Sequence, residues 1–145
     1  MPEIAKNKIL RAEAARFQAG TPPQRWRLTY YDPNAQYDAI ELRFEKGQMA
    51  RLHEPTRLLG ALNPQAPKPM DIEKIKIDSD EAVRIALGLP TVASLSIKTL
   101  ELELERGTGG VPIWKVRLFS IGQMEGSVTI AADDGKILKD INYKK

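Results

Sequence analysis

Apolar and charged residues alternate strictly in two stretches of the chain, at residues 39–45 (AIELRFE) and within residues 96–105 (LELELE). A period of two puts the apolar side chains on one face of a strand and the charged side chains on the other. One face of such a strand packs on a core while the other meets water, as is typical of antiparallel sheets. Both stretches are therefore predicted to be half-buried antiparallel strands.

Turn residues divide the neighbouring sequence into further strands. In the first half, strands are predicted at residues 26–30 and 48–53, on either side of residues 39–45. The stretch from Trp114 to Lys145 is predicted to be a meander of three short strands, with Asp134-Gly135 as a two-residue turn. Each half of the chain is thus expected to end in an antiparallel meander.

A helix is predicted ahead of each meander. Residues 4–19 are good helix formers with apolar residues spaced to line one helical face, and Gly20 is a suitable terminator. Residues 79–87 are predicted to form a second, shorter helix. Its start is indicated by Asp78, which is followed three residues later by Glu81 in the manner of a capping box.

The two meanders align when the chain is shifted by 88 residues, which is the separation of Trp26 and Trp114. The same shift, without a gap, places Gly47 on Gly135 and matches the apolar positions between them. This agreement predicts a duplication, with both tryptophans in the core because they share parity with the apolar residues of their strands. The strand at residues 96–105 has no expected counterpart in the first copy, which is therefore predicted to be degenerate.

These elements predict an α+β fold of two tandem helix plus antiparallel β-meander repeats, with the helices packed on one sheet face. At 145 residues the chain is long enough for two such repeats sharing one core. The first repeat is assigned to residues 1–56, a proline-rich connector to residues 57–74, and the second repeat to residues 75–145.

Charge and composition exclude several classes of protein. The net charge is only +3, and basic residues are interleaved with acidic ones, whereas a nucleic-acid groove needs basic residues clustered on one face. There is no cysteine for a disulfide or thiolate metal site, and no apolar run of about 18 residues to span a membrane. The chain is either cytoplasmic or a mature fragment from which an export signal was removed.

The order of parts in the second half resembles a PepSY domain. IDSDEAVRIAL is similar to the family's opening helix, LELELERGTGGVPIWKVRLF to its first hairpin, and GSVTIAADDGKILKD to its closing hairpin. Two such units in tandem also resemble the β-lactamase-inhibitor-protein fold, in which two repeats make a concave sheet. The resemblance implies a non-enzymatic, exported domain that restrains peptidases or binds cell-envelope partners. It supplies no catalytic residues.

Residues with catalytic or metal-binding chemistry are few and isolated. His53 is the single histidine, and no second His or any Cys completes a usual transition-metal site. Asp133-Asp134-Gly135 lacks the alternating ligands of a calcium loop, and the glycines at 107–110 lack the ending of a phosphate loop. We therefore expect no catalytic, metal-binding or cofactor-binding residues.

The charged face of the sheet is the best candidate for a binding surface. Two interpretations stay open for it, namely an ordinary solvated face held by cross-strand ion pairs, and a face that docks a protein. The residues expected to project from it are Tyr31, Glu41, Arg43, Glu101, Glu103, Lys115, Arg117 and Phe119.

The leading functional hypothesis is a non-catalytic binding module of the periplasm or extracellular space, whose partner is a peptidase or another envelope protein. The alternative is a small-ligand or sensor domain with a pocket between the helices and the sheet or between the repeats. An enzyme is disfavoured because no catalytic constellation is evident. The sequence leaves the partner's identity and the oligomeric state open.

Overall fold

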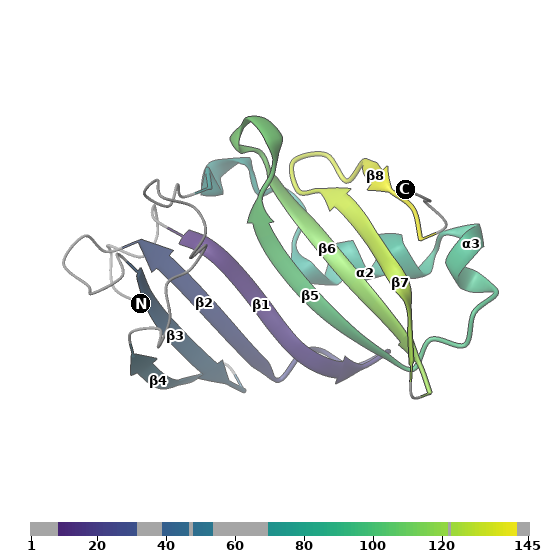
Figure 1. The fold of residues 1–145 in the computed structure, drawn as a ribbon, viewed down its shortest axis with the longest axis horizontal. Coiled ribbons are helices and arrows are strands. Elements are labelled where there is room, and N and C mark those ends of the chain that lie inside the picture. The colour runs from purple at the N-terminus through teal and green to yellow at the C-terminus, as the bar shows by residue number, and fades with distance from the viewer. Residues whose placement is uncertain (1–8, 32–38, 47, 54–69, 122, 142–145) are drawn as a thin grey trace.

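A single antiparallel sheet of eight strands, in the order β4-β3-β2-β1-β5-β6-β7-β8, forms the body of the protein (Figure 1). The computed structural model describes residues 9–31, 39–46, 48–53, 70–121 and 123–141. The strands are β1 (Ile9–Gln18), β2 (Arg25–Tyr31), β3 (Ala39–Glu45), β4 (Gln48–His53), β5 (Thr99–Arg106), β6 (Pro112–Ser120), β7 (Gln123–Ala131) and β8 (Ile137–Lys139).

Helices occur only in the second half of the described chain. They are α2 (Ser79–Leu87) and α3 (Pro90–Ala93), with short 3-10 turns η1 (Ile72–Lys74) and η2 (Thr108–Gly110). The predicted helix at residues 79–87 is confirmed, and the Asp78 carboxylate caps it by accepting a hydrogen bond from the Glu81 N–H at 2.9 Å. No helix within the described ranges is long and apolar enough to cross a membrane.

The predicted fold class, two helix-plus-meander repeats, is wrong because the chain forms mostly sheet. The described part of the first predicted helix is strand β1, which lies at the centre of the sheet and pairs with both β2 and β5. Alanine favours a helix in isolation. Here Ala12 and Ala14 instead face the core opposite Leu104 and Leu102, and two ladders of backbone hydrogen bonds outweigh the local preference.

The two halves of the sheet mirror each other about the β1–β5 pair. β1 takes the place in the first half that β5 takes in the second, so the expectation that β5 has no counterpart is wrong. Trp26 pairs with Phe44 and Trp114 pairs with Ile130, which makes β3 and β7 equivalent at an offset of 86 rather than 88 residues. An offset without a gap is therefore wrong at this strand, although a two-residue slip preserves which side chains face inward.

The edge strands show the same local irregularity in both halves. The pairing between β3 and β4 skips one residue after Arg43, and the pairing between β7 and β8 skips one after Thr129, at the equivalent position. The loop between β7 and β8 is wider than the predicted two-residue turn. Ala131 N–H bonds to Lys136 O, and Gly135, at φ +79°, donates to Ala131 O.

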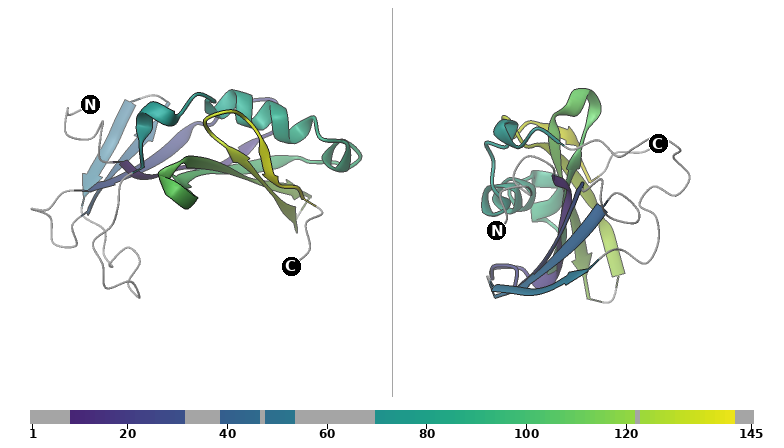
Figure 2. Two further views of the ribbon diagram at one scale, coloured as in Figure 1. Left: turned by 90° about the horizontal axis from the view of Figure 1, so that it is seen from above. Right: turned by 90° about the vertical axis from the view of Figure 1, so that its left-hand side faces the viewer.

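The helices cover one face of the sheet, over the strands of the second half (Figure 2). Side chains that are completely or almost completely buried between the two layers include Ala82 and Ala86 of α2 and Leu102, Val116 and Ile130 of the sheet. On the same face of β2 and β3, a smaller cluster joins Leu28, Tyr30, Leu42 and Phe44. The core thus lies on the helix side, which leaves the opposite face of the sheet to charged residues.

Candidate binding face

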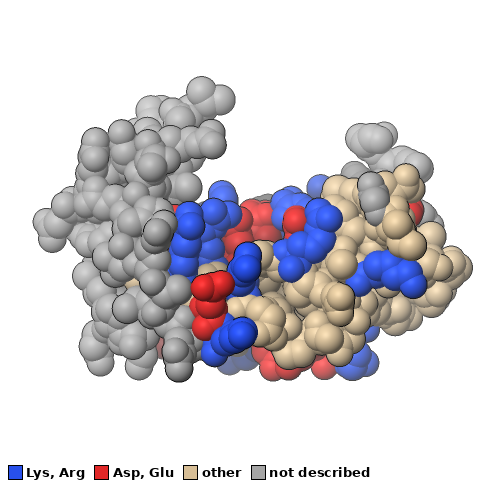
Figure 3. Space-filling model, turned by 90° about the horizontal axis from the view of Figure 1, so that it is seen from below, with Lys and Arg blue, Asp and Glu red and all other residues tan. Residues whose placement is uncertain are grey.

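The face of the sheet turned away from the helices, called the polar face below, carries charged residues on neighbouring strands. Strand alternation places Glu41 and Arg43 of β3, Arg27 of β2, and Glu101 and Glu103 of β5 there. Basic and acidic side chains gather together over the middle of the molecule when it is seen from below (Figure 3). Because positive and negative charges cancel in the sum, a small net charge is compatible with this strongly charged surface.

Ion pairs join these side chains into one network across β3, β2, β1, β5 and β6. Arg27 contacts Glu41 at 3.1 Å and Glu13 at 2.8 Å, which links β2 to both of its neighbours. Arg11 contacts Glu13 at 3.6 Å and Glu103 at 3.3 Å, and so carries the network over the β1–β5 junction. The members in spatial order are Arg43, Glu41, Arg27, Glu13, Arg11, Glu103 and Arg117.

Two carboxylates in this network are buried, although both were expected on a water-exposed face. Glu41 and Glu103 are 8% and 7% exposed, whereas the side chains of Arg27 and Arg43 remain about half exposed. Long arginine stems cover the shorter glutamates, and a buried carboxylate is tolerated because it is paired. The arginines therefore form the accessible layer of this part of the polar face.

The pKa of Arg27 is raised by its two acidic partners. Burial by itself lowers the pKa of a guanidinium, but the hydrogen bonds and negative charges of Glu13 and Glu41 outweigh burial and raise the pKa of Arg27. Arg27 is thus a fixed cation that bridges two strands.

Glu103 and Glu105 are neighbours on β5 with opposite pKa shifts. Burial opposes ionisation of Glu103, yet hydrogen bonds from Arg117 and Glu105 and the charges of Arg11 and Arg117 lower its pKa. Burial raises the pKa of Glu105, and its hydrogen bond to the Glu103 carboxylate raises it further. Glu103 therefore carries the negative charge while Glu105 is the member of the pair that keeps a proton more readily.

A separate contact holds the far end of the polar face. The Arg16 guanidinium lies 3.6 Å from the centre of the Phe119 ring and forms a 3.3 Å ion pair with Glu101. Phe119 is consequently only 7% exposed, so the expectation that it points into water as a docking group is wrong.

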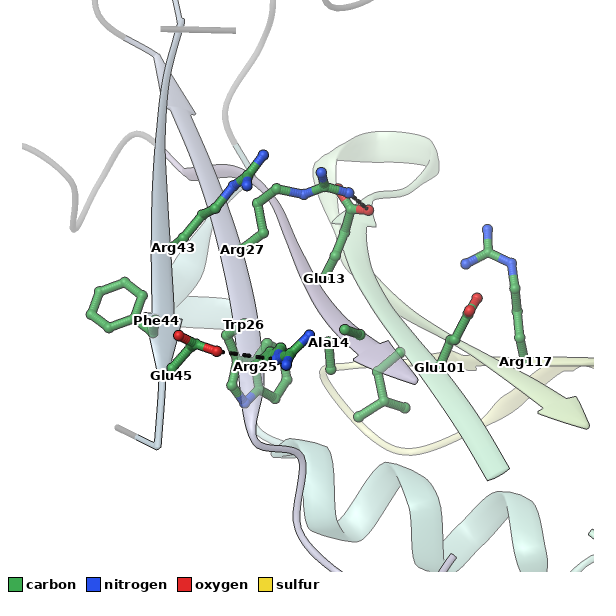
Figure 4. Close-up of a pocket in the computed structure, with 12 residues that line it drawn as sticks. Glu13, Ala14, Arg25, Trp26, Arg27, Arg43, Phe44, Glu45, Glu101 and Arg117 are labelled. Carbon is green, nitrogen blue, oxygen red and sulfur yellow. Dashed lines mark hydrogen bonds and ion pairs between the residues drawn. The ribbon is translucent and has the colours of Figure 1, made fainter. Parts of the chain in front are cut away.

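A hollow of about 680 Å³ opens in the middle of the sheet (Figure 4). Ala15, an exposed small residue where the β1–β5 pairing shifts register, belongs to its lining. In Figure 4, Arg27, Arg43 and Arg117 project to the same side of the strands. The charged residues that line the hollow are Glu13, Arg25, Arg27, Arg43, Glu45, Glu101 and Arg117.

A second hollow of about 670 Å³ lies at the other end of β6, beside the β5–β6 and β7–β8 loops. Its lining includes Lys115, Lys136 and Lys139 together with Glu105 and Asp133. Lys115 is thus separated from the hollow that contains Arg117, although both residues belong to β6.

Four of the eight predicted face residues, Glu41, Arg43, Glu103 and Arg117, belong to the ion-pair network. The predicted cross-strand pairing of β5 with β6 is confirmed by the 2.8 Å contact between Arg117 and Glu103, while Glu101 pairs with Arg16 of β1 instead. Tyr31, at the end of β2, pairs in register with Ala39 and does not line either hollow. His53 pairs in register with Glu41, and its side chain lies outside the described part of the structure.

Three charged residues of β1 that belong to this face were not among the predicted ones, namely Arg11, Glu13 and Arg16. These residues were hidden because residues 4–19 were interpreted as a helix. The alternation of Arg11 and Glu13 with Ala12 and Ala14 was the available signal of a strand. Without β1 the two halves could not be joined into one charged surface.

Comparisons with known protein families, with curated proteins and with solved structures find no match to this chain.

Proposed function

We propose that this chain is a non-catalytic protein-binding module, and that a segment of its partner lies in the hollow around Ala15 on the polar face. The observation that carries the proposal is this hollow of about 680 Å³, in which seven of the twelve lining residues are charged and most of these are held by ion pairs. A surface that is ordered before binding loses little conformational entropy when a partner arrives.

The extent of the hollow favours a polypeptide segment over a single small ligand. Its lining comes from β3, β2, β1, β5 and β6, which span about 19 Å at a strand spacing of about 4.8 Å. An extended peptide advances about 3.3 Å per residue, so about six residues would cross that distance. Neither of the two hollows lies between the helices and the sheet, one of the two places at which a small-ligand pocket was expected. The first hollow lies at the other place, between the two halves, so the preference for a polypeptide rests on its extent.

A peptidase or other envelope protein as the partner, and a periplasmic or extracellular setting, form part of the same proposal. Their support is the resemblance of residues 76–141 to a PepSY domain. The order of α2, β5, β6, β7 and β8 in the structure agrees with the order of parts on which that resemblance was based.

A photocrosslinking comparison tests the polar face. Benzoylphenylalanine is placed at Ala15 in the hollow, or at Ala93 on α3 as an exposed control away from it. The expected result is a crosslink to a partner protein that forms from position 15 and not from position 93. Excess unlabelled wild-type chain should prevent this crosslink by competing for the partner. The Arg43→Glu substitution should abolish it while the circular dichroism spectrum of the variant is unchanged. Identical products from both positions, or products that survive Arg43→Glu, would contradict the proposal.

A further inference from the structure

Arg27 and Arg43 are directly opposite each other on β2 and β3, and Arg43 also pairs in register with Arg51 of β4. Like charges in that position destabilise a sheet unless an anion lies beside them. The carboxylate of Glu41 forms ion pairs with both Arg27 and Arg43. Its oxygens lie 3.1 Å from Nε of Arg27 and 3.5 Å from Nη2 of Arg43. Its contact with Arg43 is long for a charge-assisted hydrogen bond, which usually measures about 2.7–2.9 Å.

Arg43 consequently retains unused hydrogen-bonding capacity. Its Nε atom is buried and has no hydrogen-bond partner among the residues that the structure describes. A buried unpaired donor is costly, and an arginine offers five N–H donors in a fork that matches an oxyanion. The side chain as a whole is 43% exposed and belongs to the lining of the hollow.

The other charges that line the hollow do not supply the missing acceptor. Glu45 pairs with Arg25 at 3.1 Å, Glu13 pairs with Arg27, and Glu101 pairs with Arg16, which is not part of the lining. The lining thus contains four arginines and three glutamates, and each glutamate already has a cation. A ligand carboxylate in the hollow would accept from the exposed part of the Arg43 guanidinium, whereas the Nε donor is itself buried.

We infer that the partner segment is acidic, and that a carboxylate of it binds between Arg43 and Arg27. This inference rests on the proposed function and specifies its partner chemistry. The oxyanion chemistry is shared with inorganic phosphate, so the two sources must be distinguished by experiment. The segment also passes Arg117 on the opposite wall of the hollow, which accommodates a second acidic residue.

Nuclear magnetic resonance of the arginine Nε–Hε groups tests the inference with hexaglutamate as the probe. On titration at 0.15 M salt, the signals of Arg43 and Arg27 should shift and saturate, while that of Arg84 on α2 should not. Arg43→Gln should weaken hexaglutamate binding at least fivefold, and Arg84→Gln, which removes the same charge from an exposed helix, should leave it unchanged. Circular dichroism of both variants confirms that they are folded.

The outcomes separate this inference from the proposed function. Equal loss in Arg43→Gln and Arg84→Gln would show attraction by net charge alone and overturn the inference. Saturation of the Arg43 signal by inorganic phosphate at lower concentration than by hexaglutamate would also overturn it, in favour of a simple anion site. If hexalysine binds this face and hexaglutamate does not, the acidic-segment inference fails while the face remains a binding surface.

Discussion

The indole rings of Trp26 and Trp114 meet edge to face, with their centres 6.4 Å apart and their planes at 69°. They belong to β2 and β6, which are separated in the sheet by β1 and β5. Between them, Ala14 lies opposite Trp26 and Ala12 lies in the next inward row, and these small residues leave room for the two rings. The pair therefore connects the two halves of the sheet on the helix side. The 88-residue spacing of the two tryptophans had indicated only that the halves are similar in sequence.

Trp114→Phe should destabilise the protein by about 1–3 kcal/mol. The buried Trp114 ring donates a hydrogen bond from Nε1 to the Ile77 carbonyl at 2.8 Å, and phenylalanine would leave that carbonyl without its donor. Urea unfolding followed by circular dichroism measures the change. Trp26→Phe is the matched control because Trp26 is only half-buried, and a larger loss from Trp26→Phe would contradict the expectation.

Gly126→Ala should destabilise the β6–β7 hairpin for two distinct reasons. Gly126 has φ +148°, and an added Cβ would lie 2.6 Å from Cγ1 of Ile141. Ile141→Ala removes the clash but not the backbone strain, so a double-mutant cycle should show that the two substitutions together cost less than their separate costs combined. Strict additivity of the unfolding free energies would show that the clash with Ile141 is not the cause.

Arg117→Gln should cost about 1–3 kcal/mol, because it leaves the buried Glu103 carboxylate without one of its cations. Arg25→Gln removes the same charge from a pair whose side chains are 72% and 56% exposed, and should cost at most about 1 kcal/mol. Thermal or urea unfolding at 0.15 M salt compares the two variants. Equal losses would mean that the network stabilises the fold no more than an ordinary surface pair does.

Glu105→Gln should stabilise the protein at neutral pH. Because the pKa of Glu105 is raised above its usual 4.5 in the folded state, its ionisation there is unfavourable, and stability falls as pH rises from 4.5 through the raised value. Glutamine removes this penalty, so the gain should be complete above that window and should disappear toward pH 4.5.

Glu103→Gln should behave in the opposite way. The folded-state pKa of Glu103 is lowered, so its contribution to stability is present above its usual 4.5 and is lost as pH falls through the lowered value. The variant should therefore be less stable than wild type at neutral pH, with the difference shrinking in acid. Urea unfolding at a series of pH values measures both effects, and parallel stability curves for wild type and variants would contradict them.

The strands β3 and β4 and helix α2 were predicted with the bounds that the structure has, since each carries a clear local signal. Strict alternation marks β3, and the Asp78 cap marks the start of α2. Strand β1 was mistaken for a helix because its inward residues are alanines, which satisfy a helical period as readily as a strand. Only the ladders to β2 and β5 determine its conformation.

In the strands that it predicted, the sequence by itself determined the parity of the residues, because a period of two assigns each side chain to one face wherever one face is buried. It thereby placed Glu41, Arg43, Glu103 and Arg117 on a common side of the sheet. Which guanidinium reaches which carboxylate was decided only by the tertiary structure, since Glu13 on β1 contacts Arg27 on β2 and Glu103 on β5 contacts Arg11 on β1. Those contacts depend on strand order and register, which arise from long-range pairing and not from local pattern.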